Sequence, residues 1–239
     1  MYKTIIFFYG SFFYAGMLSF AQTTVIHDPH AISRTVGNFS SIHVSGGIDL
    51  YLSQGGEDGL AVSAANDKIR DRIKTTVDKG ILQISYEGNG MNYNSGNKKM
   101  TAYVSFKSLN RVSASGSSDI YANGTIKGDA LHIKLSGASD FKGGIETIKL
   151  NISQSGASDA NISGKASSVE VDVSGASKFK GYKLETENCT VTASGASDVQ
   201  ITVNKELNAI ANGASSIYYK GSGVIREIRS NGASKVKKM

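Results

Sequence analysis

The sequence predicts an all-β protein, a single-domain β-solenoid whose rungs are about 19 residues long. Three observations predict this fold. A five-residue motif recurs seven times at a nearly constant spacing, apolar and polar residues alternate around each copy, and the chain contains one Pro in 239 residues. A repeat of this length is too short for a crossover helix between parallel strands. Each repeat must therefore form one coil that stacks on the next, and a right-handed coil is expected because parallel crossovers favour that hand.

The motif has the form Ser/Asn-Gly-Ala/Ser-Ser-Asp/Lys/Ser, and its glycines are separated by 21, 19, 19, 20, 18 and 19 residues. A glycine at this point tolerates a positive φ, so it predicts a tight corner between two strands. A serine follows two residues after each glycine and is expected to bond along the stack or to corner backbone groups. The corner residues are Gly116, Gly137, Gly156, Gly175, Gly195, Gly213 and Gly232, with Ser118, Ser139, Ser158, Ser177, Ser197, Ser215 and Ser234.

Apolar residues stand six, four and two positions before most of these glycines and four positions after them, as in Leu131, Ile133 and Leu135. Polar residues lie between them, which is the period-2 pattern of strands with one buried face. Cys189 shares its position with Val169 of the preceding repeat, so it is expected to be a small buried side chain. As the single cysteine of the chain, it cannot form an internal disulfide.

An aspartate follows three residues after several of the glycines, at Asp119, Asp140, Asp159 and Asp198. Two interpretations are open for this row. Asp119, Asp140 and Asp159 could chelate Ca²⁺ through their carboxylate oxygens. Alternatively, the row is a solvated turn whose carboxylates pair with nearby lysines such as Lys180. No catalytic residue is predicted, because a serine nucleophile needs a histidine and an acid beside it, and none of the four histidines recurs with the repeat. No cofactor site is predicted either.

Residues 34–107 have the same strand-like alternation but a less regular spacing. Gly46-Gly47 indicates an eighth, diverged corner with Asp49 in the aspartate position, and Asp78-Lys79-Gly80 indicates a hairpin. Residues 66–75 are compatible with either a short helical turn or a charged edge strand, and residues 88–99 read as a polar loop. A solenoid needs its ends covered, and this half is expected to cover one of them, while the Lys-rich last repeat is expected to protect the other.

The predicted domain organisation has three parts. Residues 1–21 read as a secretory signal peptide, with Lys3 before an apolar stretch and Ser19 and Ala21 at the cleavage positions. Residues 22–33 are an N-terminal extension, and residues 34–239 form the solenoid, irregular over 34–107 and regular over 108–239. The apolar stretch of 16 residues is short for a membrane anchor, and no membrane span is predicted after cleavage. Basic residues are scattered without interleaved aromatic residues, which argues against nucleic acid as a partner.

The run Arg34 to Leu50 (RTVGNFSSIHVSGGIDL), the short matches Ser53-Gln54-Gly55 and Gly80 to Ile84, and the SGASD repeats together resemble a known family. They are similar to the putative auto-transporter adhesin, head GIN domain family of secreted bacterial proteins, particularly from Bacteroidetes. The resemblance covers about residues 34–236. It implies a single β-helical domain outside the cytoplasm, in the periplasm, at the outer membrane or outside the cell, and it transfers no catalytic residue.

Three functions follow as hypotheses. The first is a non-enzymatic binding module of the envelope, an adhesin head that presents a repetitive surface to a glycan, matrix or envelope-protein partner. The second is a structural or sensory envelope protein without an adhesive role. The third is a β-helical enzyme acting on polysaccharides, which would require a cluster of acids or bases that breaks the repeat; Lys178, Glu185, Glu187 and His132 are the departures that could form one.

Overall fold

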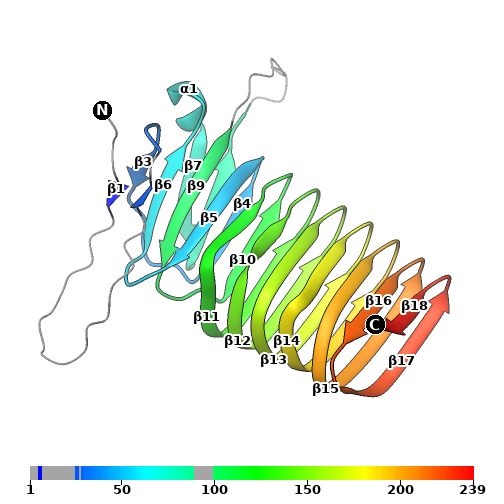
Figure 1. The fold of residues 1–239 in the computed structure, drawn as a ribbon. Coiled ribbons are helices and arrows are strands. Elements are labelled where there is room, and N and C mark those ends of the chain that lie inside the picture. Colours follow the sequence, from blue (N-terminus) through cyan, green and yellow to red (C-terminus); the bar gives the residue numbers. More distant parts are fainter. Residues whose placement is uncertain (1–4, 7–24, 27, 89–98) are drawn as a thin grey trace, which may run out of the picture.

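The structure is a computed structural model, and it describes residues 5–6, 25–26, 28–88 and 99–239 (Figure 1). The predicted signal peptide lies outside the described residues except for Ile5–Ile6, and so does the predicted polar loop except for its first and last residues. Within the described parts the fold is a long stack of strands that ends in β17 and β18. The prediction of an all-β solenoid with rungs of about 19 residues is confirmed.

The strands before the regular stack are short. They are β1 Ile5–Ile6, β2 Val25–Ile26, β3 Ile32–Arg34, β4 Ser41–Ser45, β5 Ile48–Gln54, β6 Gly59–Ser63, β7 Ile73–Asp78, β8 Ile81–Tyr86 and β9 Met100–Phe106. The stack continues with β10 Arg111–Ser115, β11 Ile120–Leu135, β12 Phe141–Gln154, β13 Asp159–Val173, β14 Lys178–Ala193, β15 Asp198–Gly213, β16 Ser216–Lys220, β17 Val224–Gly232 and β18 Lys235–Lys238. The helix α1 covers Asp67–Arg70.

From β10 onward, each rung pairs in parallel with the next. Phe141 pairs with Ala160 and Ala160 pairs with Phe179, so one circuit is 19 residues at these points. Because identical positions align from rung to rung, like side chains form columns along the solenoid. Within the stack the inward columns are fully buried, as Leu131, Leu150 and Val169 show with exposed fractions of 2% or less.

The first half of the chain stacks out of sequence order. The rung formed by β4 and β5 pairs with β10 and β11 on one side, although some 70 residues separate them. On its other side it pairs with β8 and β9, which come later in the chain. The rung of residues 41–54 is therefore held between two rungs that follow it in sequence.

The outer edges of β8 and β9 are covered by antiparallel strands. β7 pairs with β8, β6 pairs with β9, and β3 pairs with β6. The predicted hairpin joins β7 to β8 with positive φ angles of 48° at Lys79 and 76° at Gly80. Residues 66–75 contain both alternatives that the sequence left open. The helix α1 is capped by the Asn66 side chain, and two residues separate the end of α1 from the start of β7. β3 also begins inside the predicted N-terminal extension.

No helix in the described part of the chain is long and apolar enough to cross a membrane.

Candidate binding face

A row of outward-facing side chains runs along the whole stack, on the strands that follow the glycine corners. Its members share one position, five residues after the corner glycine wherever a repeat has one, and successive members are partners in the strand register. From the N-terminal to the C-terminal end the row consists of Tyr103, Tyr51, Tyr121, Lys142, Asn161, Lys180, Gln200, Tyr218 and Lys237. We call this surface the tyrosine–lysine face. Strands about 4.8 Å apart make it roughly 40 Å long.

Three tyrosines at the N-terminal end of this face are stacked on one another. The ring centroids of Tyr51 and Tyr103 are 5.5 Å apart, and those of Tyr51 and Tyr121 are 5.1 Å apart, with interplanar angles of 28° and 23°. Each ring face of Tyr51 is therefore covered by a neighbour. Tyr51 as a whole residue is 40% exposed. Stacked rings of this kind present edges and hydroxyls to a partner rather than flat faces.

Carboxylates lie beside these tyrosines and accept hydrogen bonds from two of them. The Tyr103 hydroxyl donates to Asp28 at 3.0 Å, and the Tyr121 hydroxyl donates to Asp119 at 3.3 Å. Burial, and then the nearby carboxylates of Asp119 and Asp49, raise the pKa of Tyr121 to about 12. Burial and Asp28 raise the pKa of Tyr103 in the same way. Both phenols therefore remain protonated donors throughout the physiological pH range.

The predicted aspartate row lies next to the tyrosine–lysine face and begins with Asp49. Its carboxylates bond to backbone groups of the following rung: Asp119 accepts from the N–H of Asp140, and Asp140 accepts from the N–H of Asp159, both at 3.0 Å. Burial, and then the Asp119 and Asp159 carboxylates, raise the pKa of Asp140 despite the hydrogen bond from the Asp159 backbone. Asp159 is bonded to Lys180 at 2.9 Å, the pairing that the solvated-turn interpretation expects.

Among the described residues, no group of three or more His, Cys, Asp or Glu side chains is arranged to hold a metal ion. Asp119, Asp140 and Asp159 do lie in adjacent rungs. One oxygen of Asp119 and one of Asp140, however, already accept a hydrogen bond from the backbone of the next rung. Asp119 and Asp140 act in the structure as backbone acceptors, whereas Asp159 pairs with Lys180.

The corner glycines lie in a file along the stack, and all seven have positive φ between 65° and 80°. The serine hydroxyls beside them are buried, except Ser234 in the last rung, which is partly exposed. They bond to the corner backbone: the single hydroxyl hydrogen of Ser215 lies within reach of the carbonyl oxygens of Asn212, at 2.9 Å, and Ala193, at 3.1 Å. Ser158 and Ser177 also bond to each other, with their hydroxyl oxygens 3.2 Å apart.

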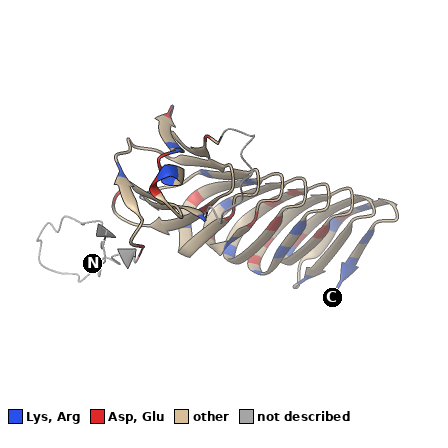
Figure 2. Ribbon diagram, turned by 90° about the horizontal axis from the view of Figure 1, so that it is seen from above, with Lys and Arg blue, Asp and Glu red and all other residues tan. Residues whose placement is uncertain are grey.

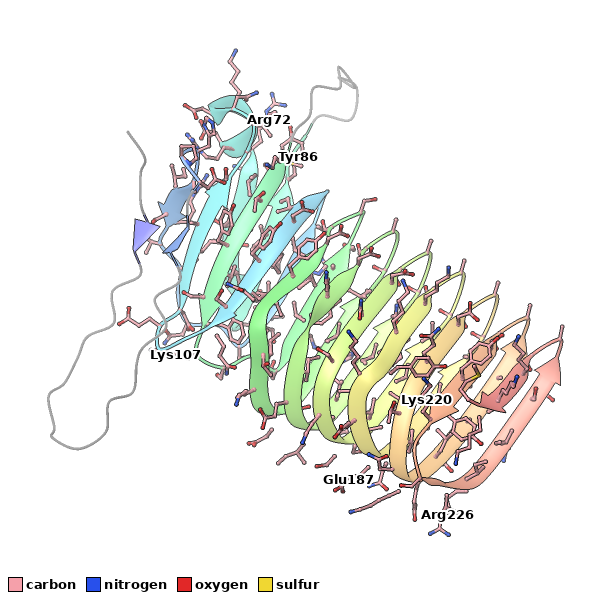
Figure 3. The ribbon with its side chains drawn as sticks, in the orientation of Figure 1. Arg72, Tyr86, Lys107, Glu187, Lys220 and Arg226 are labelled. Atoms are coloured by element: carbon pink, nitrogen blue, oxygen red, sulfur yellow. The ribbon has the colours of Figure 1, made fainter. Side chains whose placement is uncertain are left out.

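The four departures from the repeat are not gathered into one cluster. Glu185 and Glu187 line an open groove of about 630 Å³ on another side of the solenoid, where they pair with Lys165 and Lys205. Figure 3 shows Glu187 at the lower edge of the stack. His132 and Lys178 do not line that groove: His132 lies beside Ser153, and Lys178 stands between Asp159 and Asp198 in the aspartate row. The thiol of Cys189 is buried, which raises its pKa to about 12.

A hollow of about 500 Å³ adjoins the tyrosine–lysine face at its N-terminal end. It lies beside Tyr103 and Thr101 on β9 and is also lined by Asp28, His30 and Lys99. Sequence reasoning missed this region and the three stacked tyrosines. Tyr51 and Tyr121 both stand five residues after a corner glycine, which was the available signal, but their contact depends on the out-of-order stacking of the first rungs.

Comparison with solved structures shows the same fold in bacterial proteins. A putative adhesin from Bacteroides fragilis aligns with a TM-score of 0.82 at 22% identity, over 87% of this chain and 96% of that one. A putative adhesin from Parabacteroides distasonis aligns with a TM-score of 0.70 at 19% identity, over 87% and 96% of the two chains. A putative lipid binding protein from Parabacteroides distasonis aligns with a TM-score of 0.65 at 17% identity, over the same shares.

A search among curated proteins found no match. A family model, by contrast, matches residues 38–223, which span the corner of the β4–β5 rung and nearly all of the regular stack. The chain belongs to the family described as "Putative auto-transporter adhesin, head GIN domain".

Proposed function

We propose that this protein is a non-enzymatic binding module of the cell envelope, exported by its N-terminal segment, and that the tyrosine–lysine face contacts a protein partner. The observation that carries the proposal is the unbroken register of nine outward side chains from Tyr103 to Lys237. Weak contacts repeated along a rigid surface add through multivalency. The adhesin description of the family supports a role in binding.

The ring geometry favours a protein over a glycan as the partner. A sugar that stacks on an aromatic residue needs an open ring face, and both faces of Tyr51 are covered by Tyr103 and Tyr121. Tyrosine edges, with the Tyr103 and Tyr121 hydroxyls bonded to carboxylates, lie beside lysine and amide side chains. Together they form the mixed apolar and hydrogen-bonding surface that is enriched at protein interfaces.

The experiment is an array of matrix and envelope proteins, with glycans printed beside them, probed with the purified protein. We expect capture by one or more proteins. The variant Tyr51→Ser/Tyr121→Ser should reduce the captured signal by about tenfold, since aromatic residues are frequent hot spots. The matched control is Ile148→Ser, which removes a 61% exposed apolar side chain from the groove on another side of the solenoid.

A second pair of variants tests the lysines. Lys142→Ala lies on the tyrosine–lysine face and should weaken binding, whereas Lys149→Ala lies at an exposed position outside this face and should not. If Tyr51→Ser/Tyr121→Ser and Ile148→Ser lose the same share of the captured signal, the partner does not bind through the tyrosine–lysine face. Capture by glycans alone would make a glycan the partner, and no capture at all would count against a binding module.

A further inference from the structure

The two ends of the solenoid differ. At the N-terminal end, β7 and β6 cover the edges of β8 and β9. At the C-terminal end, β17 pairs with β15 and β18 pairs with β16, and no described strand pairs with their outer edges. Figure 1 shows these two strands as the last layer of the stack. Their outward N–H and C=O groups are the kind of edge to which another strand can bond.

The apolar columns of the core continue to this open end. Ile225 pairs in register with Leu207, and Ile228 pairs with Ala209. Leu207 and Ala209 are 1% and 0% exposed, because a further rung covers them, whereas Ile225 and Ile228 are 41% and 42% exposed. A strand added to β17 would bury these two isoleucines and would gain the hydrophobic stabilisation that the other rungs already have.

The open end also holds most of the net charge of the chain. Residues 220–239 contain six basic residues and one acidic residue, a net charge of +5, while the whole chain has +6. The acidic residue, Glu227, is paired with Arg229. The basic residues are Lys220, Arg226, Arg229, Lys235, Lys237 and Lys238. Figure 2 shows the terminal strand beside the C-terminus in the colour of Lys and Arg.

This charge disfavours a second copy of the chain as the occupant. Two such ends brought together would place Lys235, Lys237 and Lys238 of each copy near the same residues of the other. Lysines on an edge strand are a common protection against self-pairing. They protect β18, whereas β17 has two exposed isoleucines in its inward positions.

We propose that the outer edge of β17 binds an extended, acidic segment of a partner protein, which adds a strand to the end of the solenoid. Backbone hydrogen bonds to β17 would supply part of the affinity, and Ile225 and Ile228 would be covered by alternate apolar side chains of the segment. Acidic side chains between these apolar ones would lie near the lysines and arginines of residues 220–239. This attraction favours an acidic segment over a neutral or basic strand.

The probe is a fluorescein-labelled decapeptide of alternating Glu and Val, titrated with the purified protein and followed by fluorescence anisotropy. We expect it to bind at least about tenfold more tightly than the matching Lys and Val decapeptide, with an affinity that falls as salt increases. Amide hydrogen exchange should slow in β17 when the peptide is bound, which reports strand pairing directly.

Two double variants separate the contribution of the lysine charge to peptide affinity from that of burying the two isoleucines. Lys235→Glu/Lys237→Glu should weaken binding about tenfold, and Ile225→Thr/Ile228→Thr should weaken it several-fold while leaving the charge unchanged. The matched control is Lys149→Glu/Lys183→Glu, at exposed positions within the stack, which should bind like the parent protein.

Four outcomes would overturn the proposal. Equal affinity for the acidic and basic peptides would remove the charge argument. Equal affinity for unstructured polyglutamate, without protection of β17, would show attraction without strand addition. Binding to anionic phospholipid vesicles but not to the peptide would make the end a membrane contact. A dimer in sedimentation experiments that is lost in Ile225→Thr/Ile228→Thr would make a second copy the occupant.

Discussion

Gly137 lies directly against Gly156 in the next rung: a β-carbon built on Gly156 would stand 2.5 Å from the carbonyl oxygen of Gly137. The same relationship recurs between Gly156 and Gly175, where the distance is 2.4 Å. The corner backbones are therefore as close as neighbouring strands allow. Glycine is required at these positions by space and by conformation together, since φ is 80° at Gly156 and 75° at Gly175.

Replacing Gly156 tests this requirement. Gly156→Ala should lower the free energy of unfolding by about 2–4 kcal/mol, because an alanine at positive φ is strained and its β-carbon displaces the rung below. Chemical denaturation followed by circular dichroism measures the effect. The control is Gly128→Ala, since Gly128 has no atom within 4 Å of its built β-carbon and no positive φ. That change should be neutral or slightly stabilising, and equal losses in the two variants would refute the argument.

Ser118 makes additional hydrogen bonds, because it lies where the chain stacks out of sequence order. The Ser118 hydroxyl accepts hydrogen bonds from the backbone N–H groups of Gly47 and Ile48, both at 3.1 Å. These bonds join the first regular rung to the rung formed by β4 and β5. Ser118→Ala should therefore cost about 1–3 kcal/mol, because two donors lose their acceptor in a buried corner.

Differential scanning calorimetry of Ser118→Ala beside Ser167→Ala provides the measurement. Ser167 is exposed, so its loss should change the melting temperature little. A Ser118→Ala protein as stable as the parent would mean that water replaces the hydroxyl at the corner.

The regular half of the fold could be predicted from the sequence because one physical rule, the alignment of like positions, governs every rung from β10 onward. The glycine spacing gave the circuit length, and the alternation around it gave the buried columns that include Ile133 and Val171. Gly46-Gly47 was read as a corner, and Leu50 indeed pairs with Ile120 as a corner neighbour should.

The stacking order of the first rungs could not be predicted. The residue pattern of a diverged repeat indicates that it forms a rung, but it does not indicate on which other rungs it stacks. Residues 55–80 form a cap before the chain returns with β8 and β9, so the β4–β5 rung ends up between later ones. The stacking of Tyr51 between Tyr103 and Tyr121 follows from that order. The candidate binding face could therefore be predicted only in part: Tyr121 and Tyr218 share one position, five residues after a corner glycine, but the contact of Tyr51 with Tyr103 and Tyr121 could not be predicted.

Gln154 is a polar residue in a buried column whose other members from Ala114 to Ala211 are apolar. It is 3% exposed and takes the position that Leu135 and Val173 have in the adjacent rungs. Its amide nitrogen donates to the carbonyl oxygens of Ser158 and Lys178, at 3.0 and 3.1 Å, while its side-chain oxygen has no partner. The unpaired buried oxygen costs free energy that the two hydrogen bonds only partly offset.

Two substitutions at this position have opposite expectations. Gln154→Leu should leave the free energy of unfolding within about 1 kcal/mol of the parent or raise it, because the column then becomes apolar from Ala114 to Ala211. Gln154→Ala should lower it by about 2–4 kcal/mol, because a cavity is left between rungs. Urea denaturation distinguishes them, and a Leu variant as unstable as the Ala variant would show that the two donated hydrogen bonds hold the corner.

The aspartate row should make stability depend on pH. In the folded protein, burial and the neighbouring Asp119 and Asp159 carboxylates raise the pKa of Asp140, and burial with Asp119 raises that of Asp49. An acid with a raised folded pKa binds more protons in the folded state than in the unfolded state. Its contribution to stability is therefore complete below the unfolded pKa of 3.8 and is lost as the pH rises through the folded value.

Asp140→Asn removes this repulsion while keeping an oxygen that can accept from the Asp159 backbone. We expect the variant to have a higher denaturation midpoint than the parent at pH 7. The difference should be smaller at pH 3.5, where more of the parent's carboxylate is protonated. Asp172→Asn removes an exposed carboxylate elsewhere on the stack and serves as the charge control. If both variants gain equally at pH 7, the gain reflects net charge, and repulsion between stacked carboxylates contributes nothing measurable to the row.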